Sequence, residues 1–571
     1  MNTRPWLTCR CSLVLFAMAV PVRAQTQDAR RPKKLIATGW DHVDSERLLA
    51  HHVEMQKRPF DGVVVQIVGR SEGKRRWPMR RTFSAEAWQK EWFEPCVRNL
   101  RACKLTRFTD NFLQVGANPG DVDFFDDAGW GQIVDHWRIA ANTAKRAGFK
   151  GLLFDPEPYT PPHAQFKYAA QPQREKHTFD EYCAQARRRG REVMKAVADE
   201  CPDVTLFCYF MNSVVSRATG RADPRPALKP MGYGLLPAFL DGWLDAAPPT
   251  VTFVDGCESA YLYNSVRQYI EAALRIKGAC QELVSPANRA TYRAQVQVSF
   301  GVYLDACWNP KDSQWGRWYV DGLGGPRVER LRANVQTALR AADQYVWVYG
   351  EKFRWWPTPN GRVRPQSWPE ALPGCGKVLA YARDPVEYAR ALIARRAAAG
   401  TLQNLLTNGD FAYGKVELPD GRVSAWKPGR PPVGWSGWQD EKSKGALIWD
   451  RKAGPAGKGA AKAAKVASGC FLQGLPAKPG EHYAVRAKRR LEGRGEAWLR
   501  VRWQTAEGKW TAEGKDLVLH APAPREKWQE VVGVVEVPEG VGRLLVLLLV
   551  GDQPTDGDLA WFADAGVYRI E

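Results

Sequence analysis

Two hydrophobic periods alternate between Lys33 and about Gly400, and this alternation limits the possible folds more than any other feature. Short apolar runs rich in β-branched residues predict strands at 35–40, 62–68, 105–115, 151–154, 204–210, 250–254, 296–303 and 345–349. Stretches of helical period lie between them, for example 45–56, 85–103, 131–147, 179–200 and 328–342. Thr178 and Glu181 have capping-box spacing at the start of one such helix. About eight strand–helix repeats predict a (β/α)8 TIM barrel of the α/β class, with an open α/β sheet as the alternative.

A different pattern begins after Asn404, where the helical period ends. Short strand patterns at 483–489, 497–504, 528–536, 543–550 and 559–570 alternate with turns rich in glycine and proline. They predict a C-terminal all-β sandwich over 404–571, following a barrel domain over 33–400. The small, basic stretch 451–465 is expected to be an exposed loop.

The first 24 residues have the features of a cleaved signal peptide. A short start with Arg4 and Arg10 precedes the apolar run 11–20, and Ala24 stands at a suitable cleavage position. A membrane anchor is the alternative, but the run is shorter than the roughly 20 residues that span a bilayer. We therefore expect a secreted or periplasmic protein without a membrane span. Export permits disulfides, but the apolar surroundings of Cys208, Cys257 and Cys307 favour buried thiols.

The charge balance is basic, with 82 Lys and Arg against 62 Asp and Glu and a formal net charge of +20. Such a balance is compatible with an acidic polymer, nucleic acid or a membrane surface, and it does not choose among them. The arginines at 187–189 fall on a predicted helix and indicate a solvated face, so no nucleic-acid partner is expected. Serine-hydrolase, zinc-protease and phosphate-loop motifs do not occur in the sequence. No metal or cofactor is expected.

Polar residues follow nearly every predicted barrel strand, at the end where barrel active sites form. Asp155 and Glu157 stand two residues apart, so both side chains would lie on one face of the fourth strand. Two adjacent carboxylates repel each other, which raises one pKa and keeps an acid protonated near neutral pH. Glu351 follows the eighth strand, which lies across a barrel from the fourth. These three residues are the predicted catalytic groups, because glycoside hydrolysis uses a pair of carboxyl groups on either side of the bond.

Other polar and aromatic residues near the strand ends are predicted to bind substrate. Tryptophan faces would stack on sugar rings, and carboxylates, amides and hydroxyls would hold sugar hydroxyls. The predicted binding residues are Trp40, Asp41, Asp110, Tyr209, Asn212, Asp255, Asp305, Tyr349, Trp355 and Trp356.

The β-sandwich region also carries a resemblance to a known class of modules. Its opening, 404–411 (NLLTNGDF), its segment beginning at Trp528 (WQEVV) and its closing 560–568 (AWFADAGVY) resemble jelly-roll carbohydrate-binding modules. The barrel looks like that of glycoside hydrolases, without matching one family. The resemblance implies a secreted glycoside hydrolase with a C-terminal jelly roll, acting on a polysaccharide or oligosaccharide. The basic balance weakly favours an anionic glycan.

Several alternatives remain open at this stage. Asp155 could orient an acetamido group in a substrate-assisted mechanism, as in chitinase-like barrels. A pairing of Asp155 with Asp255 resembles α-galactosidase-type barrels. A non-catalytic, secreted carbohydrate-binding protein with a degenerate barrel is the main competing function, and a polysaccharide lyase or esterase is a weaker one.

Overall fold

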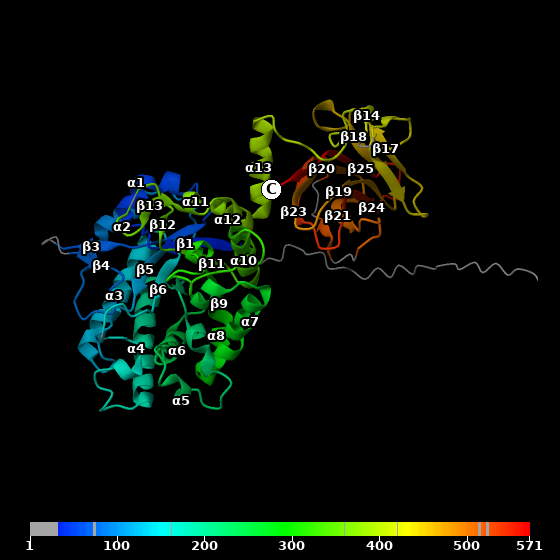
Figure 1. Ribbon diagram of the computed structural model, residues 1–571. Helices are drawn as coiled ribbons and strands as arrows, with labels where there is room; N and C mark the ends of the chain where they lie inside the picture. The colour runs from blue at the N-terminus through cyan, green and yellow to red at the C-terminus, as the bar shows by residue number, and fades with distance from the viewer. Residues whose placement is uncertain are drawn as a thin grey trace, which may run out of the picture. The chain divides into compact units, whose positions relative to one another are not determined.

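The computed structural model describes residues 32–71, 76–161, 163–358, 360–418, 421–511, 515–520 and 525–570. The chain forms two compact units, Arg31–Tyr388 and Ala389–Glu571, drawn in blue to green and in yellow to red in Figure 1. The predicted signal peptide over residues 1–24 lies outside the described residues.

The first unit is built on a closed ring of parallel strands. The strands are β1 (Lys34–Gly39), β2 (Gly62–Val65), β5 (Phe112–Gly116), β6 (Gly151–Asp155), β7 (Thr205–Cys208), β8 (Thr252–Asp255), β9 (Val296–Val298), β10 (Phe300–Tyr303) and β11 (Tyr345–Gly350). They pair in the order β10-β11-β1-β2-β5-β6-β7-β8-β9. Only Ser299 separates β9 from β10, so these two segments act as one strand and close the ring. The result is the predicted eight-stranded barrel, with its seventh strand interrupted.

Helices follow the barrel strands and cover the outside of the ring (Figure 1). They are α1 (Ser45–Met55), α2 (Glu94–Ala102), α3 (Asp127–Arg146), α4 (Phe179–Glu200), α5 (Arg225–Leu228), α6 (Leu236–Ala246), α7 (Val266–Lys277), α8 (Arg289–Gln295), α9 (Leu304–Trp308), α10 (Arg327–Ala341), α11 (Trp368–Ala371) and α12 (Cys375–Arg383). The next helix in the chain, α13 (Pro385–Ala398), belongs for most of its length to the second unit. Strands β2, β5, β6 and β7 are buried along their whole length, as expected for a sheet covered on both faces. The predicted capping box is present at α4, where Thr178 and Glu181 bond each other's backbone N–H groups.

The second unit contains two antiparallel sheets, which confirms the predicted all-β region. Their strands are β16 (Ser436–Gln439), β17 (Ala446–Asp450), β18 (Ala460–Ala464), β19 (Ser468–Pro476), β20 (His482–Glu492), β21 (Glu496–Gln504), β22 (Leu517–Leu519), β23 (Gln529–Glu536), β24 (Arg543–Gly551) and β25 (Leu559–Arg569). The sheet orders are β16-β19-β24-β21-β22 and β17-β18-β25-β20-β23. A shared core between the sheets contains Phe471, Leu499, Val546 and Phe562. The expectation of an exposed loop over 451–465 is wrong in part, because β18 buries Ala460, Ala461 and Ala463, whose small side chains fit the core.

Six short strands complete the described strands: β3 (Val68–Arg70), β4 (Arg76–Pro78), β12 (Phe353–Arg354), β13 (Arg364–Ser367), β14 (Lys415–Glu417) and β15 (Val423–Ala425). All ten cysteines in the described part of the chain carry free thiols, and Cys208, Cys257 and Cys307 are buried, as predicted. Within the described residues, no helix combines the length and apolar character needed to cross a bilayer.

Candidate active site

The carboxyl ends of the barrel strands form one mouth, and the strand order places β6 and β11 on opposite sides of it. Asp155 ends β6 and Glu157 follows two residues later, whereas Glu351 follows β11 directly. The negative charge of Glu157 contributes to a raised pKa at Glu351, so these two side chains act on each other electrostatically across the mouth.

A local hydrogen-bond network holds Glu157. Its backbone N–H donates to Asp155 Oδ1 at 3.0 Å, and the Tyr159 hydroxyl lies 2.5 Å from Glu157 Oε2 and 3.1 Å from Asp155 Oδ2. Burial first, and then the charge of Glu157, raise the pKa of Asp155 to about 7. Asn118 fixes this loop from the end of β5, because its side chain bonds the Glu157 carbonyl at 2.8 Å and the Tyr159 N–H at 2.9 Å. Sequence reasoning missed Asn118, which has no motif around it.

Glu351 is held in a parallel manner on the other side. Its backbone N–H donates to the buried Asp305 Oδ2 at 2.8 Å, and the Tyr303 hydroxyl bonds its carboxylate. Burial raises the pKa of Glu351, while the Tyr303 hydrogen bond opposes the shift. Burial also raises the pKa of Asp305 to about 7. The Asp305 carboxylate therefore fixes the Glu351 backbone, and it is fully buried, so it cannot contact a ligand.

Glu258 is the residue that sequence reasoning passed over. It opens the short helix that follows β8, on the rim between Glu157 and Glu351. Burial first, then the charges of Glu157 and Asp155, and more weakly that of Glu351, raise the pKa of Glu258 to about 8. Asp155 and Glu258 therefore both retain protons near neutral pH, and the charge of Glu157 contributes to both shifts. The signal in the sequence was the position of Glu258, three residues after Asp255, which ends β8.

Two predicted binding residues on β7 and β8 are buried beside this group. Asp255 accepts from Ser213 N–H at 3.0 Å, Ser213 Oγ at 2.5 Å and Cys257 N–H at 3.2 Å, so it ties the β7 loop to β8. Asn212 is fully buried, and neither polar atom of its amide has a partner among the described residues. A buried amide with both ends free is suited to a ligand or a water.

Aromatic side chains line the interior below the rim. Tyr209 is buried, stacks on Trp347 at 4.5 Å between ring centroids and shares a 2.7 Å hydrogen bond with Thr38. Tyr349 is half-buried and receives a hydrogen bond from the side chain of Trp40. Trp40 itself is 45% exposed at the end of β1, so its ring face is available for stacking.

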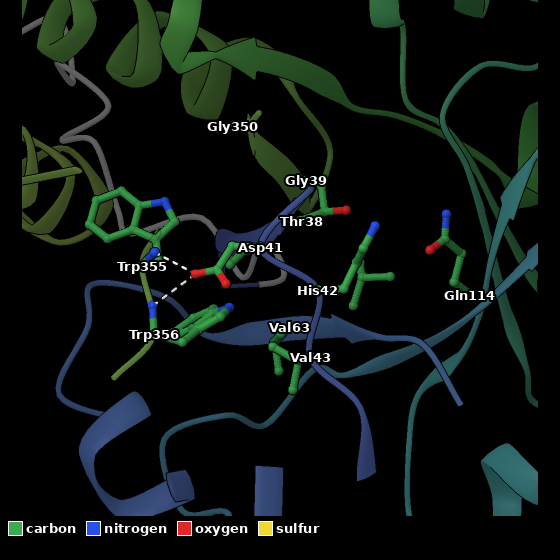
Figure 2. A pocket seen from close by; sticks show the side chains of 12 residues that line it. Thr38, Gly39, Asp41, His42, Val43, Val63, Gln114, Gly350, Trp355 and Trp356 are labelled. Atoms are coloured by element: carbon green, nitrogen blue, oxygen red, sulfur yellow. Dashed lines mark hydrogen bonds between the residues drawn. The ribbon is translucent and has the colours of Figure 1, made fainter. Parts of the chain in front are cut away.

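Trp355 and Trp356 do not present faces to the mouth, contrary to the expectation. They are 3% and 2% exposed and pack edge-on against Phe60 at centroid distances of 5.2 and 6.1 Å. Figure 2 shows Asp41 beside them, where its Oδ2 atom accepts from the backbone N–H groups of Trp355 and Trp356 at 2.7 and 3.0 Å. Asp41 also accepts from Arg47 at 2.7 Å. The adjoining cavity of about 10 Å³ has room for about one water, not for a sugar.

Asp110 lies at the wrong end of the barrel for the role predicted for it. Strand β5 begins at Phe112, so Asp110 precedes the strand. It accepts from the Tyr345 hydroxyl at 2.9 Å and pairs with Lys34 at 3.4 Å, and these two residues start β11 and β1. The predicted strand over 105–115 begins seven residues before β5 does, so it wrongly includes Asp110. Asp110 is a structural residue at the floor of the barrel.

The acidic rim is not arranged as a metal centre. Across the part of the chain that the structure describes, no group of three or more His, Cys, Asp or Glu side chains could hold a metal ion.

Comparisons with known proteins identify no family. No family model matches the chain, and no curated protein matches it. Among similar solved structures are the enzymatically active domain of tailspike protein 4 from bacteriophage CBA120 (13% identity, 29% of this chain and 21% of that chain, TM-score 0.23) and the xylanase 10B modules of Clostridium thermocellum complexed with xylohexaose (12% identity, 24% and 26%, TM-score 0.20). A Stig cyclase from Fischerella is equally similar (14% identity, 29% and 96%, TM-score 0.22). The chain spans about a quarter of the length of the tailspike and xylanase structures. At these TM-scores the likenesses assign no activity.

Proposed function

We propose that the protein is a secreted glycoside hydrolase that cleaves a polysaccharide or oligosaccharide with the carboxyl pair Glu157 and Glu351. One observation carries the proposal: two half-exposed glutamates stand on opposite strands of one barrel mouth, and each is held by a buried aspartate and a tyrosine hydroxyl. Such a pair on either side of a glycosidic oxygen can supply both the acid and the base or nucleophile of hydrolysis.

Glu157 is the general acid and base in this proposal. Asp155 lies beside it with a pKa of about 7, so the Asp155 carboxyl is partly protonated near neutral pH. A proton held there can pass to the leaving oxygen, and the Tyr159 hydroxyl, which contacts both carboxyls, keeps them together.

Glu351 is the nucleophile, or the base that activates water. The hydrogen bond from Tyr303 favours its ionised form, and Asp305 fixes its backbone. The separation of the two carboxyls distinguishes the outcomes: about 5–5.5 Å suits retention and about 6.5–9.5 Å suits inversion.

Substrate would be held by groups that remain available at the mouth. Trp40 offers an exposed ring, and Glu258 offers a protonated carboxyl. Asn212 is fully buried, so its free amide is not exposed at the mouth. In the same proposal, residues 33–400 form the catalytic domain and residues 404–571 a carbohydrate-binding-like domain.

The test is a polysaccharide-degradation screen read as released reducing ends. Wild type, Glu157→Gln, Glu351→Gln and the control Glu175→Gln would run side by side, because Glu175 is an exposed residue paired only with Arg174 among the described residues. We expect release by wild type and the control, and a loss of about 100-fold or more in the two site variants. Full activity in both site variants would refute the proposal. Binding by all four proteins without release would favour the non-catalytic, carbohydrate-binding alternative.

A further inference from the structure

The rim of the barrel mouth is divided by charge. The carboxyls Glu157, Glu258 and Glu351 follow β6, β8 and β11. The loops after β1 and β2, together with the longer loop beyond β12, instead supply His42, Arg80 and Arg362. Arg362 lies in the same connection after β11 as Glu351, but its Nη1 atom is 3.1 Å from His42, which follows β1. His42, Arg80 and Arg362 therefore form a basic arc beside β1 and β2, and a ligand in the mouth would meet both sets.

His42 links the basic arc. Its Nε2 atom lies 3.1 Å from Arg362 Nη1 and 3.4 Å from Gln66 Nε2. Both partners are donors, so Nε2 is the acceptor and the ring proton belongs on Nδ1. Burial first, then the charges of Arg362 and Arg80, lower the pKa of His42 to about 3, so the ring is neutral. A neutral His42 orients the Arg362 guanidinium without adding a third charge.

The fold fixes Arg80 close to the catalytic carboxyls. The next residue, Arg81, forms an antiparallel bridge with Ala117, at the end of β5. The Arg80 carbonyl packs so closely on Gly116 that a Cβ at that glycine would lie 2.8 Å from it. Gly116 is the register partner of Asp155 on β6. Consistent with this placement, the negative charge of Asp155 raises the pKa of Arg80, whereas burial and the like charge of Arg362 lower it.

The guanidinium groups of Arg80 and Arg362 differ from that of Arg47, which also lies near His42. Arg47 is paired with Asp41 at 2.7 Å, whereas Arg80 and Arg362 form no ion pair with any described carboxylate. Both are exposed. Arg80 and Arg362 repel each other, and neither forms an ion pair with a described carboxylate. An oxyanion bound beside both would offset this repulsion.

We infer that Arg80 and Arg362, with Arg362 oriented by His42, form a subsite for an anionic substituent of the glycan, either a uronic acid carboxylate or a sulfate ester. The inference deepens the proposed function and rests on it for the identity of the ligand as a glycan. The anionic group would bind on the basic arc while the neighbouring glycosidic bond lies over the carboxyls. Guanidinium groups match carboxylate and sulfate oxygens through paired, charge-assisted hydrogen bonds.

The test measures binding, so it does not depend on turnover. Full-length wild type, the double variant Arg80→Gln/Arg362→Gln and the control Arg138→Gln would be applied to a glycan array. The array would carry uronate-containing and sulfated oligosaccharides beside their carboxyl-reduced and desulfated counterparts. Arg138 is a suitable control because its side chain on α3 is 42% exposed and pairs with Asp135 on the same helix.

We expect wild type and the control to bind acidic members, and the double variant to bind them about 10- to 100-fold more weakly, with no change on neutral counterparts. The anionic group is identified by which acidic members wild type binds, the uronate-containing or the sulfated oligosaccharides. Unchanged binding of acidic members by the double variant, a preference for the neutral counterparts, or no binding of any acidic member would overturn the inference. A loss of activity in Glu157→Gln with unchanged array binding would support the hydrolase separately.

Discussion

Removal of the Asp41 carboxylate should destabilise the barrel strongly. The Asp41 carboxylate accepts four hydrogen bonds. Two come from the backbone N–H groups of Trp355 at 2.7 Å and Trp356 at 3.0 Å, and two from the side chains of Arg47 at 2.7 Å and Asn360 at 3.2 Å. Its side chain and that of Arg47 are 6% and 9% exposed, so the pair is buried. Asp41→Ala would leave the guanidinium without its counter-charge and two buried N–H groups without acceptors. The loss of a partner from a buried ion pair costs about 3–5 kcal/mol of the free energy of unfolding.

The assay is guanidinium-induced unfolding of the full chain, followed by tryptophan fluorescence and by far-UV circular dichroism. Asp44→Ala is the matched control, because Asp44 lies three residues further on and caps α1 through a 2.8 Å bond from Arg47 N–H. Loss of that cap should cost about 1 kcal/mol. If Asp41→Ala costs no more than Asp44→Ala, the structural role argued for Asp41 is refuted. Weakened glycan binding without lost stability would restore the sugar-binding role predicted from the sequence.

Three further outcomes are expected. Trp40→Ala should weaken glycan binding about tenfold at unchanged stability, whereas Trp355→Ala should cost about 3–5 kcal/mol of unfolding free energy and leave the affinity of the folded protein unchanged. Tyr303→Phe removes a hydrogen bond that lowers the pKa of Glu351, so the acidic limb of the kcat/KM profile should move to higher pH, and an unmoved limb would contradict the assignment. Burial raises the folded-state pKa of Asp305 to about 7, so its protonated form stabilises the fold at low pH, and this stability is lost as the pH rises through about 7. In chemical unfolding, Asp305→Asn should therefore lose less unfolding free energy than wild type between pH 5 and pH 8. An equal loss in wild type and variant would count against a buried, proton-retaining Asp305.

The barrel was predictable because its signal is repeated and local. Strands such as β6 and β11 and the capped helix α4 coincide with the runs read from the sequence to within one residue. Each strand is buried on both faces, so its apolar run is continuous and easy to recognise. Strand ends are less well defined, and the misplaced start of β5 put Asp110 at the mouth instead of the floor.

The site was predictable in part. Strand order alone places Glu157 and Glu351 across the mouth, because β6 and β11 are four positions apart in a ring of eight. Burial is a property of tertiary packing, and sequence position could not reveal that Trp355 and Trp356 are 3% and 2% exposed. The raised pKa of Glu258 was equally hidden, because it depends first on burial and then on charges from residues that follow two other strands.

The central claim is that Glu157 and Glu351 act as one catalytic pair. The most direct measurement is kcat/KM for Glu157→Gln, Glu351→Gln and the double variant on a glycan that wild type cleaves. Residues that act in one step are not additive, so the double variant should lose little more than the worse single variant, within about tenfold. Losses that multiply, or a single variant that retains wild-type kcat/KM, would contradict the claim.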